Sequence, residues 1–449
     1  MKKFSFVLAV LASVFAACTT APQAGGGTAA QLARQLNAMH EGSTRVSGDT
    51  VTLTRGVGIE RDLTVPEGVT LELTEDGGLW LRNGRTLTVN GTVNAPSNRI
   101  GFDDEGGRTA PSVTINGNGT INLTDKGRLL NIDNGRKLTL DGVTLVGVDD
   151  NDSPLVSVNE GGELVLVSGE ITGNARIGDS GNGGGVAING GTFIMSGGAI
   201  TGNNAGIGGG VWIEGGGTFT MSGGEISGNS ADRFGGGGVR VTGQGTTFTM
   251  SGGEISGNTA INDGGGGINV DRGAIFTMTG GEISGNSAPN GAGVTIALGA
   301  TFTMSGGTIS GNSAGYGGGI DVNEGTTFTM KNGTISSNTC TSNGGGIHSS
   351  GNSTLSMEGG TISGNSATQQ GGGVYLSVKG VTFTMTGGTI YGSSTQGGNA
   401  NTAPNGAAIF NQTTARWGTG GTYTRGGVNQ SGGGNIASTN DTLIAIPAR

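Results

Sequence analysis

The chain is dominated by a recurring segment in which apolar and polar residues alternate. Its best-preserved form, Phe-Thr-Met-Ser-Gly-Gly-Glu-Ile-Ser-Gly-Asn, returns every 26 to 29 residues. The first residue of this segment falls at Phe193, Phe219, Phe248, Phe276, Phe302, Phe328 and Phe383, with Leu355 in the same role. Fainter copies start at Leu87, Val113, Leu138 and Leu164. About eleven to twelve units therefore cover residues 70–412, and self-similarity at a fixed period indicates a repeat architecture.

Each unit predicts three short strands. Phe302 and Met304 alternate with threonines, which places the apolar side chains on one face of a strand and the hydroxyls on the other. Ile309 is the apolar centre of the second strand, and Ile320 and Val322 flank a polar residue in the third. Gly-Gly, Ser-Gly-Asn and Gly-Gly-Gly separate the strands, and such residues accept the positive φ values that sharp corners require. Three strands per unit predict one coil of an all-β, three-sided solenoid.

Stacked coils predict continuous rows of like side chains inside the solenoid. The phenylalanines above form one row with Met195, Met221, Met250, Met278, Met304, Met330, Met357 and Met385. A second inward row comprises Ile200, Ile226, Ile255, Ile283, Ile309, Ile335, Ile362 and Ile390. One corner carries Asn203, Asn229, Asn258, Asn286, Asn312, Asn338 and Asn365. Stacked asparagine side chains can hydrogen-bond to one another along the axis, which suits a repeated turn.

The remaining segments flank this solenoid. We expect a lipoprotein signal peptide at 1–17, a tether at 18–27, an N-terminal cap at 28–48, the parallel β-helix at 49–412 and an irregular C-terminal cap or tail at 413–449. Leu32, Leu36 and Met39 share one side of a predicted amphipathic helix. We expect this short helix to cap the solenoid, because an open sheet edge invites aggregation.

The N-terminal segment predicts export and lipid attachment. Two lysines precede an apolar run at 4–15, which is shorter than the roughly 20 residues of a membrane-spanning helix. Residues 15–18, Phe-Ala-Ala-Cys, resemble a bacterial lipobox, although Phe15 stands where that motif usually has leucine. The resemblance implies that Cys18 carries lipid and anchors the protein to the outer membrane or cell surface. An ordinary signal peptide that contains a cysteine is the alternative.

Composition narrows the possible partners. The net charge of −9 argues against nucleic acid as a ligand. With Cys18 lipidated, Cys340 is the remaining thiol, so no disulfide within the chain is expected. Cys340 occupies the position held by Ala231 and Ala260 in other units, which predicts a small buried residue. We expect a monomer without cofactor or metal.

The segments Gly318-Gly319-Ile320 and Ile309-Ser310-Gly311-Asn312, with their equivalents in other units, resemble those of the right-handed parallel β-helix superfamily. More narrowly, they resemble the glycine-rich surface repeats of bacterial adhesin-like lipoproteins and polymorphic outer-membrane proteins. The resemblance implies a right-handed parallel β-helix and a cell-surface scaffold or adhesin-like binder. It implies no catalytic residue, because function lies in sites added to a fold.

The central residue of the third strand changes from coil to coil while its neighbours stay constant. This position reads Ala187, Trp212, Arg240, Asn269, Thr295, Asp321, His348 and Tyr375. We expect these side chains to point outward, and aromatic and arginine side chains are enriched in binding hot spots. The predicted ligand contacts, for a host, matrix or glycan ligand or an extracellular protein, are Trp212, Arg240, Asp321, His348 and Tyr375. Neutral variation on a solvated face is the alternative.

A polysaccharide-cleaving enzyme is the second predicted function. Asp321 and His348 lie in consecutive coils, with Cα atoms about 5 Å apart, so their side chains can hydrogen-bond and orient a general base. The Gly-His-Gly and Arg-Ile-Lys motifs of polygalacturonases do not occur in the sequence. The acidic run Asp149, Asp150 and Asp152 has oxygen ligands for weak calcium binding, but solvated turn residues are the simpler interpretation. We therefore assign no catalytic residue.

The first strand carries a Thr-x-Thr pattern on its outward face, for example at Thr301 and Thr303. It resembles the ice-binding face of some β-solenoid antifreeze proteins. Threonine is also simply a good exposed strand residue, and Ile194 and Ile275 interrupt the pattern.

Overall fold

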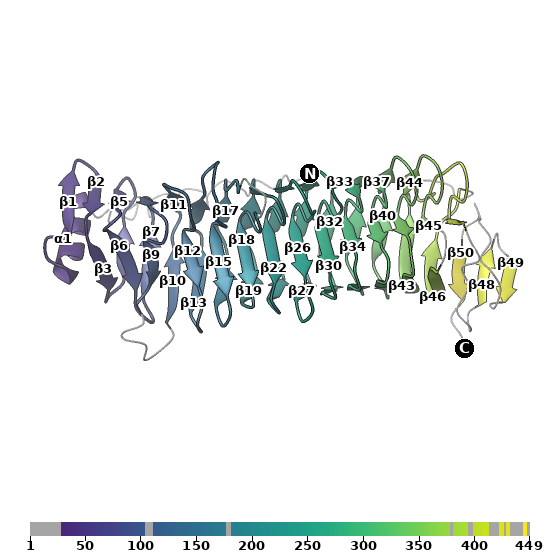
Figure 1. Ribbon diagram of the computed structural model, residues 1–449, viewed down its shortest axis with the longest axis horizontal. Coiled ribbons are helices and arrows are strands. Elements are labelled where there is room, and N and C mark those ends of the chain that lie inside the picture. Colours follow the sequence, from purple (N-terminus) through teal and green to yellow (C-terminus); the bar gives the residue numbers. More distant parts are fainter. Residues whose placement is uncertain are drawn as a thin grey trace, which may run out of the picture.

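The computed structural model describes residues 28–103, 111–176, 181–377, 380–393 and 398–412 and the strands 422–425, 428–431 and 443–446. The predicted signal peptide (1–17), the tether (18–27) with Cys18 and most of the predicted C-terminal segment (413–449) lie outside the described residues. The described chain forms a long rod, a β-solenoid of about twelve turns, with one helix at its N-terminal end (Figure 1). The predicted parallel solenoid is therefore confirmed.

The first strands of successive turns pair in parallel. They form a ladder that runs along the rod, which we call the first-strand ladder. Its members are β4 (Leu63–Val65), β7 (Thr86–Val89), β10 (Ser112–Asn116), β13 (Lys137–Asp141), β16 (Glu163–Leu166), β19 (Thr192–Met195), β23 (Thr218–Met221), β27 (Thr247–Met250), β31 (Ile275–Met278), β35 (Thr301–Met304), β39 (Thr327–Met330), β43 (Thr354–Ser363) and β46 (Thr382–Ile390). Threonines face outward in register, as in the pairs Thr301–Thr327 and Thr303–Thr329.

The second-strand ladder belongs to the same large sheet, because β43 and β46 run on around the corner and contribute to both ladders. Its other parallel members are β2 (Thr50–Leu53), β5 (Thr70–Leu73), β8 (Thr92–Ala95), β11 (Thr120–Leu123), β14 (Thr144–Val146), β17 (Glu170–Thr172), β20 (Ala199–Thr201), β24 (Glu225–Ser227), β28 (Glu254–Ser256), β32 (Glu282–Ser284), β36 (Thr308–Ser310) and β40 (Thr334–Ser336).

The third strand of each turn forms two further sheets. The N-terminal one comprises β3 (Gly56–Ile59), β6 (Gly78–Leu81) and β9 (Ile100–Phe102). The longer one, the third-strand ladder, comprises β12 (Leu130–Ile132), β15 (Val156–Asn159), β18 (Val186–Asn189), β22 (Val211–Glu214), β26 (Val239–Thr242), β30 (Ile268–Asp271), β34 (Val294–Ile296), β38 (Ile320–Val322), β42 (Ile347–Ser349), β45 (Val374–Leu376) and β47 (Ile409–Asn411).

The prediction of three strands per coil is wrong for the later turns, which have a fourth. The extra strands are β21 (Asn204–Ala205), β25 (Ser230–Ala231), β29 (Thr259–Ala260), β33 (Ser287–Asn290), β37 (Ser313–Tyr316), β41 (Thr339–Cys340) and β44 (Ser366–Ala367). They directly follow the corner asparagines and turn a small side chain inward, so Ala231 is fully buried. Cys340 takes the same position between Ala314 and Ala367, as expected for a small buried residue.

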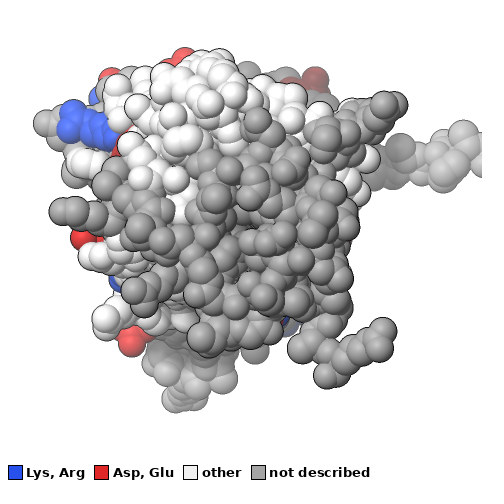
Figure 2. Space-filling model, turned by 90° about the vertical axis from the view of Figure 1, so that its right-hand side faces the viewer, with Lys and Arg blue, Asp and Glu red and all other residues white. Residues whose placement is uncertain are grey.

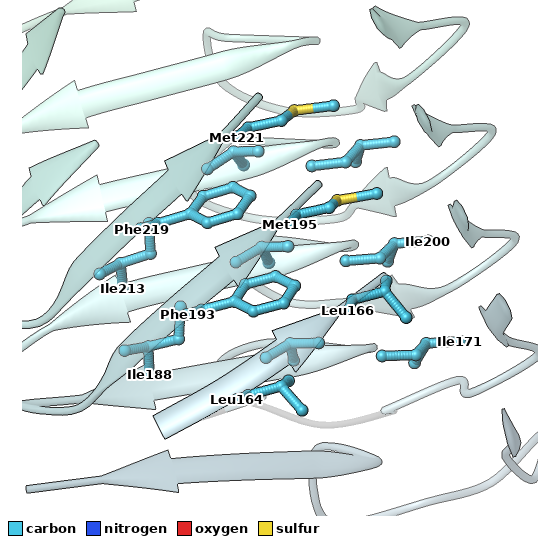
Figure 3. Close-up of a cluster of buried hydrophobic side chains, with 14 of the residues drawn as sticks. Leu164, Leu166, Ile171, Ile188, Phe193, Met195, Ile200, Ile213, Phe219 and Met221 are labelled. Atoms are coloured by element: carbon cyan, nitrogen blue, oxygen red, sulfur yellow. The ribbon is translucent and has the colours of Figure 1, made fainter. Parts of the chain in front are cut away.

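The core consists of the predicted rows of like side chains. Figure 3 shows Phe193 above Leu164 and below Phe219, with Met195 and Ile200 packed beside them. The rings of Phe193 and Phe219 stack with centroids 4.7 Å apart and planes 5° from parallel. Both phenylalanines are completely buried. Such a row adds stacking to the area removed from water at every turn.

One expected register is wrong. Leu87 was predicted to begin the phenylalanine row, but it pairs with Ile115, which pairs in turn with Leu140 and belongs to the methionine row. Val113 instead pairs with Leu138, as predicted. A shift of two residues keeps every side chain on the same face of a strand, so the alternating pattern cannot detect it.

The two ends of the rod differ from its body. Helix α1 (Ala29–Met39) begins at the N-cap Thr28, whose hydroxyl accepts a hydrogen bond from the Gln31 amide, and it buries Leu32 and Leu36 against the first turn. Strand β1 (Thr44–Ser47) then pairs antiparallel with β2. Within the described residues no helix is long and apolar enough to cross a membrane.

At the other end three antiparallel strands follow the last turn. β48 (Thr422–Arg425) pairs with β49 (Val428–Ser431) and β50 (Leu443–Ile446), and β50 also pairs with the end of β46. Seen from this end, the described Lys, Arg, Asp and Glu side chains lie scattered around the outline, with both signs present (Figure 2).

The corner asparagines form the predicted ladder and extend it to Asn151, Asn174 and Asn401. From Asn229 to Asn401 the side-chain oxygen accepts hydrogen bonds from both the backbone amide and the side-chain amide of the asparagine one turn earlier. For Asn286 these donors are Asn258 N, at 2.9 Å, and Asn258 Nδ2, at 3.0 Å. The Asn286 side-chain amide donates to the Ile255 carbonyl at 2.9 Å. Both polar groups of the Asn286 side chain are thus paired with neighbouring turns.

We predict that Asn286→Ala lowers the free energy of unfolding by about 1–3 kcal/mol for each buried group left without a partner. Denaturant unfolding followed by far-ultraviolet circular dichroism measures this change. Asn332→Ala is the control, because Asn332 is exposed in a turn, and it should change stability by less than about 0.5 kcal/mol. Equal effects of the two substitutions would show that the ladder does not stabilise the fold.

Candidate ligand-binding site on the third-strand ladder

The variable residues of the third strand lie in one continuous row, as predicted. Strand pairing aligns Ala187, Trp212, Arg240, Asn269, Thr295, Asp321, His348 and Tyr375 as successive neighbours. Phe410 continues the row after Tyr375. The flanking residues of each strand point into the core, for example the fully buried Ile320 and Val322 around Asp321. The central side chain therefore points away from the core.

The expected exposure of this row is wrong for most of its members. Trp212 and Arg240 are each 8% exposed, Tyr375 is 5% exposed and Asp321 is 4% exposed. The glycine-rich segment before each third strand folds back beside the row. Gly236 has a φ of +71°, and a Cβ on it would lie 2.9 Å from the Cβ of Arg240. Because glycine has no side chain, this segment approaches the row closely and covers it.

Asp321 and His348 form the predicted hydrogen bond. His348 Nδ1 lies 2.7 Å from Asp321 Oδ1, and Asn323 Nδ2 donates to the other carboxylate oxygen at 3.0 Å. A carboxylate only accepts, so Nδ1 carries the proton and Nε2 is the ring nitrogen left to meet a ligand. Nε2 has no hydrogen-bond partner among the described residues. The His348 side chain keeps 13% exposure, so the pair is accessible through its histidine.

Aromatic rings extend from this pair in both directions. The rings of His348 and Tyr375 stack with centroids 5.2 Å apart, and Tyr375 stacks on Phe410 at 5.6 Å. Tyr316, from β37, lies 5.5 Å from the His348 ring and is tilted by 55°. Tyr316 is 43% exposed, whereas burial raises the pKa of Tyr375, whose hydroxyl donates to Gln412. The exposed ring of the site is therefore Tyr316.

Tyr316 and His348 lie at a pocket of about 300 Å³. Its walls are formed by Asp263, Asn290, Thr295, Tyr316, Asp321, Asn323 and His348. The sequence identified Asp321 and His348, but it missed Tyr316 and Asn290. Both lie on fourth strands, β37 and β33, which the sequence did not predict. The site is thus built between the third and fourth strands of neighbouring turns.

A family model described as the right-handed beta helix region matches residues 209–390, which span β22 to β46 and the whole pocket. The chain therefore has the right-handed parallel β-helix fold. Neither a comparison with curated proteins nor one with solved structures gives a match. Enzymes and non-enzymes share the right-handed β-helix fold, so the match supports the architecture and leaves the activity to be argued from the site.

Other groups of this β-helix that could carry chemistry are engaged in structural contacts. Asp150, in the acidic run of residues 149–152, forms an ion pair with Lys126 at 2.6 Å. Burial raises the pKa of the Cys340 thiol to about 11, so it is not a nucleophile at neutral pH. Within the described part of the chain no three His, Cys, Asp or Glu side chains are grouped to hold a metal ion.

Arg240, a predicted ligand contact, forms a buried ion pair instead. Its Nη2 atom lies 2.6 Å from Asp271 Oδ2, and the two side chains are 10% and 5% exposed. Burial lowers the pKa of Arg240, while the charges of Asp271 and Asp263 oppose this shift. The β-helix therefore holds this arginine within its surface layer, beside the equally buried Trp212.

We predict that Asp271→Ala lowers the free energy of unfolding by about 3–5 kcal/mol, because it leaves the Arg240 charge buried without a partner. The double variant Arg240→Met/Asp271→Leu removes both charges and should lie much closer to the unsubstituted protein. Denaturant unfolding of the two variants makes the comparison. If the single substitution were no more harmful than the double, the ion pair would not be the dominant interaction here.

Proposed function

We propose that this β-helix is a cell-surface scaffold that binds glycans through the pocket beside Asp321 and His348. The observation that carries the proposal is a histidine oriented by a carboxylate at 2.7 Å inside an aromatic-edged pocket. Ligand pockets combine apolar and aromatic walls with a few placed polar groups, and they begin at about 300 Å³. The exposed Tyr316 ring offers a flat surface to a sugar ring, and His348 Nε2 meets a hydroxyl.

Polysaccharide cleavage is the second candidate function, favoured by the same hydrogen bond. A carboxylate that holds Nδ1–H fixes the tautomer in which Nε2 can accept a proton, as a general base requires. Asp263 lines the same pocket and supplies a second carboxylate, which glycoside hydrolysis needs. Binding is the preferred proposal, because the pocket is open to solvent at Tyr316, which is 43% exposed, and catalysis benefits from a water-poor site.

We predict that Tyr316→Ala and His348→Ala each weaken glycan binding about tenfold, the loss expected for residues at the centre of a site. A glycan array identifies the ligand, and titration calorimetry measures the change in affinity. Phe234→Ala is the matched control, because Phe234 is an aromatic residue of similar exposure, 52%, outside the pocket. Binding that survives both pocket substitutions would contradict the proposal.

The products of incubation separate the two candidate functions. Intact oligosaccharides after incubation support a binder. Shortened chains with a new reducing or unsaturated end, formed by the unsubstituted protein and not by His348→Ala, would establish the enzyme instead.

The proposed surface location depends on Cys18. We predict that the mature chain starts at a lipidated Cys18, since residues 15–18 resemble a lipobox. Mass spectrometry of the mature N-terminus tests this, and Cys18→Ser should release the protein from the membrane fraction. An unmodified N-terminus, or one that starts elsewhere, would refute the anchor.

A further inference from the structure

The pocket beside His348 is acidic. Two carboxylates, those of Asp263 and Asp321, belong to its wall, and none of the described residues that line it is a lysine or an arginine. Asp321 is already engaged, because one of its oxygens lies 2.7 Å from His348 Nδ1 and the other accepts a hydrogen bond from Asn323 at 3.0 Å. The carboxylate that a ligand can meet is therefore that of Asp263.

Asp263 lies in the turn between β29 and β30, and its side chain is half-buried. Its Oδ1 atom accepts a hydrogen bond from the Gly264 amide at 2.8 Å. Within the part of the chain that the structure describes, Asp263 forms no ion pair and its Oδ2 atom has no hydrogen-bond partner. The charge of Asp263 acts on Arg240, but that guanidinium is bound by Asp271 at 2.6 Å. Asp263 thus keeps a negative charge and an acceptor oxygen for a cationic group of a ligand.

Strand register places Asp263 and Tyr316 at separate positions along the pocket. Gly264, the next residue, pairs with Asn290, which pairs in turn with Tyr316. Two layers therefore separate the acid from the aromatic ring along the rod, which at about 4.8 Å per layer gives about 10 Å. His348 belongs to the turn after Tyr316, and the centroids of their rings are 5.5 Å apart. The pocket is thus elongated along the rod, with its acid toward one end and its rings toward the other.

The acid discriminates between sugars of different charge. A uronic acid or a sulfated sugar would bring a further negative charge to a pocket that already holds Asp263 and Asp321, and like charges repel. A neutral sugar offers hydroxyl groups only. A protonated amino group forms a charge-assisted hydrogen bond with a carboxylate, which is roughly twice as strong as a neutral one. The pocket therefore favours a sugar that carries a positive charge.

We propose that the ligand is an oligosaccharide of amino sugars with free amino groups, a proposal that rests on the glycan binding proposed above. The ammonium group of one ring pairs with Asp263, a neighbouring ring packs its C–H face on Tyr316, and a hydroxyl group meets His348 Nε2. The spacing of about 10 Å between the first two contacts requires at least two linked rings. A free monosaccharide can form one of these contacts at a time and should bind more weakly.

Titration calorimetry of the full chain with four ligands tests the proposal. Three are the tetramers of glucosamine, N-acetylglucosamine and galacturonic acid, which share a length and differ in charge, and the fourth is tetralysine. All titrations use one buffer, at a pH where the sugar amine is protonated. We expect the glucosamine tetramer to bind about tenfold more tightly than each of the others, as a charge-assisted contact implies. Free glucosamine should bind more weakly than its tetramer.

Asp263→Asn removes the charge and keeps an oxygen for the Gly264 amide, so the fold should be preserved. It should lower the affinity for the glucosamine tetramer about tenfold and leave the affinity for the N-acetylglucosamine tetramer unchanged. Asp149→Asn is the matched control, because it causes the same change of net charge at an exposed position outside the pocket. It should leave both affinities unchanged. Added salt should weaken binding of the glucosamine tetramer more in the unsubstituted protein than in Asp263→Asn.

The outcomes separate the amino-sugar ligand from the glycan binding on which it rests. Equal affinities for the glucosamine and N-acetylglucosamine tetramers, both unchanged in Asp263→Asn, would overturn the amino-sugar ligand. The glycan site would still stand if Tyr316→Ala weakened both. A preference for the galacturonic acid tetramer or for tetralysine would overturn the proposal in favour of an acidic glycan or a basic peptide. An unsubstituted protein that binds none of the four ligands would also overturn it, and the glycan array would then decide the proposed function.

Discussion

In-register stacking of turns is the constraint on which this structure depends. Parallel pairing places each residue directly above its counterpart one turn away, at the spacing of neighbouring strands. A buried side chain must therefore be compatible with a copy of itself. Phenylalanine satisfies this by stacking, with centroids 4.6 Å apart at Phe219 and Phe248, and asparagine satisfies it because it both donates and accepts. A repeated buried charge would repel itself, so the interior rows are apolar or amide-bearing.

Outward-pointing side chains do not have to be compatible with a copy of themselves in the next turn. The residues of the candidate site occupy such outward positions. Asp321 and His348 are 27 residues apart in the chain, yet the register makes them immediate neighbours. Residues that differ from turn to turn can pair with one another, as Arg240 pairs with Asp271 across one step of the same ladder. The repetitive body thus fixes the geometry, and departures from the repeat create local sites.

The interior rows could be predicted from the sequence because each buried residue recurs at the repeat period. The same recurrence stabilises the core, since it lets like side chains stack. The phenylalanine, isoleucine and asparagine rows follow from the period alone, and so does the contact of Asp321 with His348. The fourth strand was not predictable, because two residues such as Ser230 and Ala231 are too short to show alternation. The burial of Trp212 was not predicted. It results from a glycine-rich segment that folds back beside this residue, and the pattern of apolar and polar residues does not indicate the path of such a segment.

The antiparallel strands at the two ends give the rod a defined length. A parallel stack of identical turns is geometrically the same object as a growing amyloid fibril, to which each new layer adds the same template. In the described strands β1 and β50 break that template, since both run against the direction of their neighbours. The molecule therefore resembles a short segment of a fibril whose two ends are closed by antiparallel strands. The number of turns sets the distance between surface residues along the rod. One inserted repeat would move every later surface residue by one layer and leave the packing of the core unchanged.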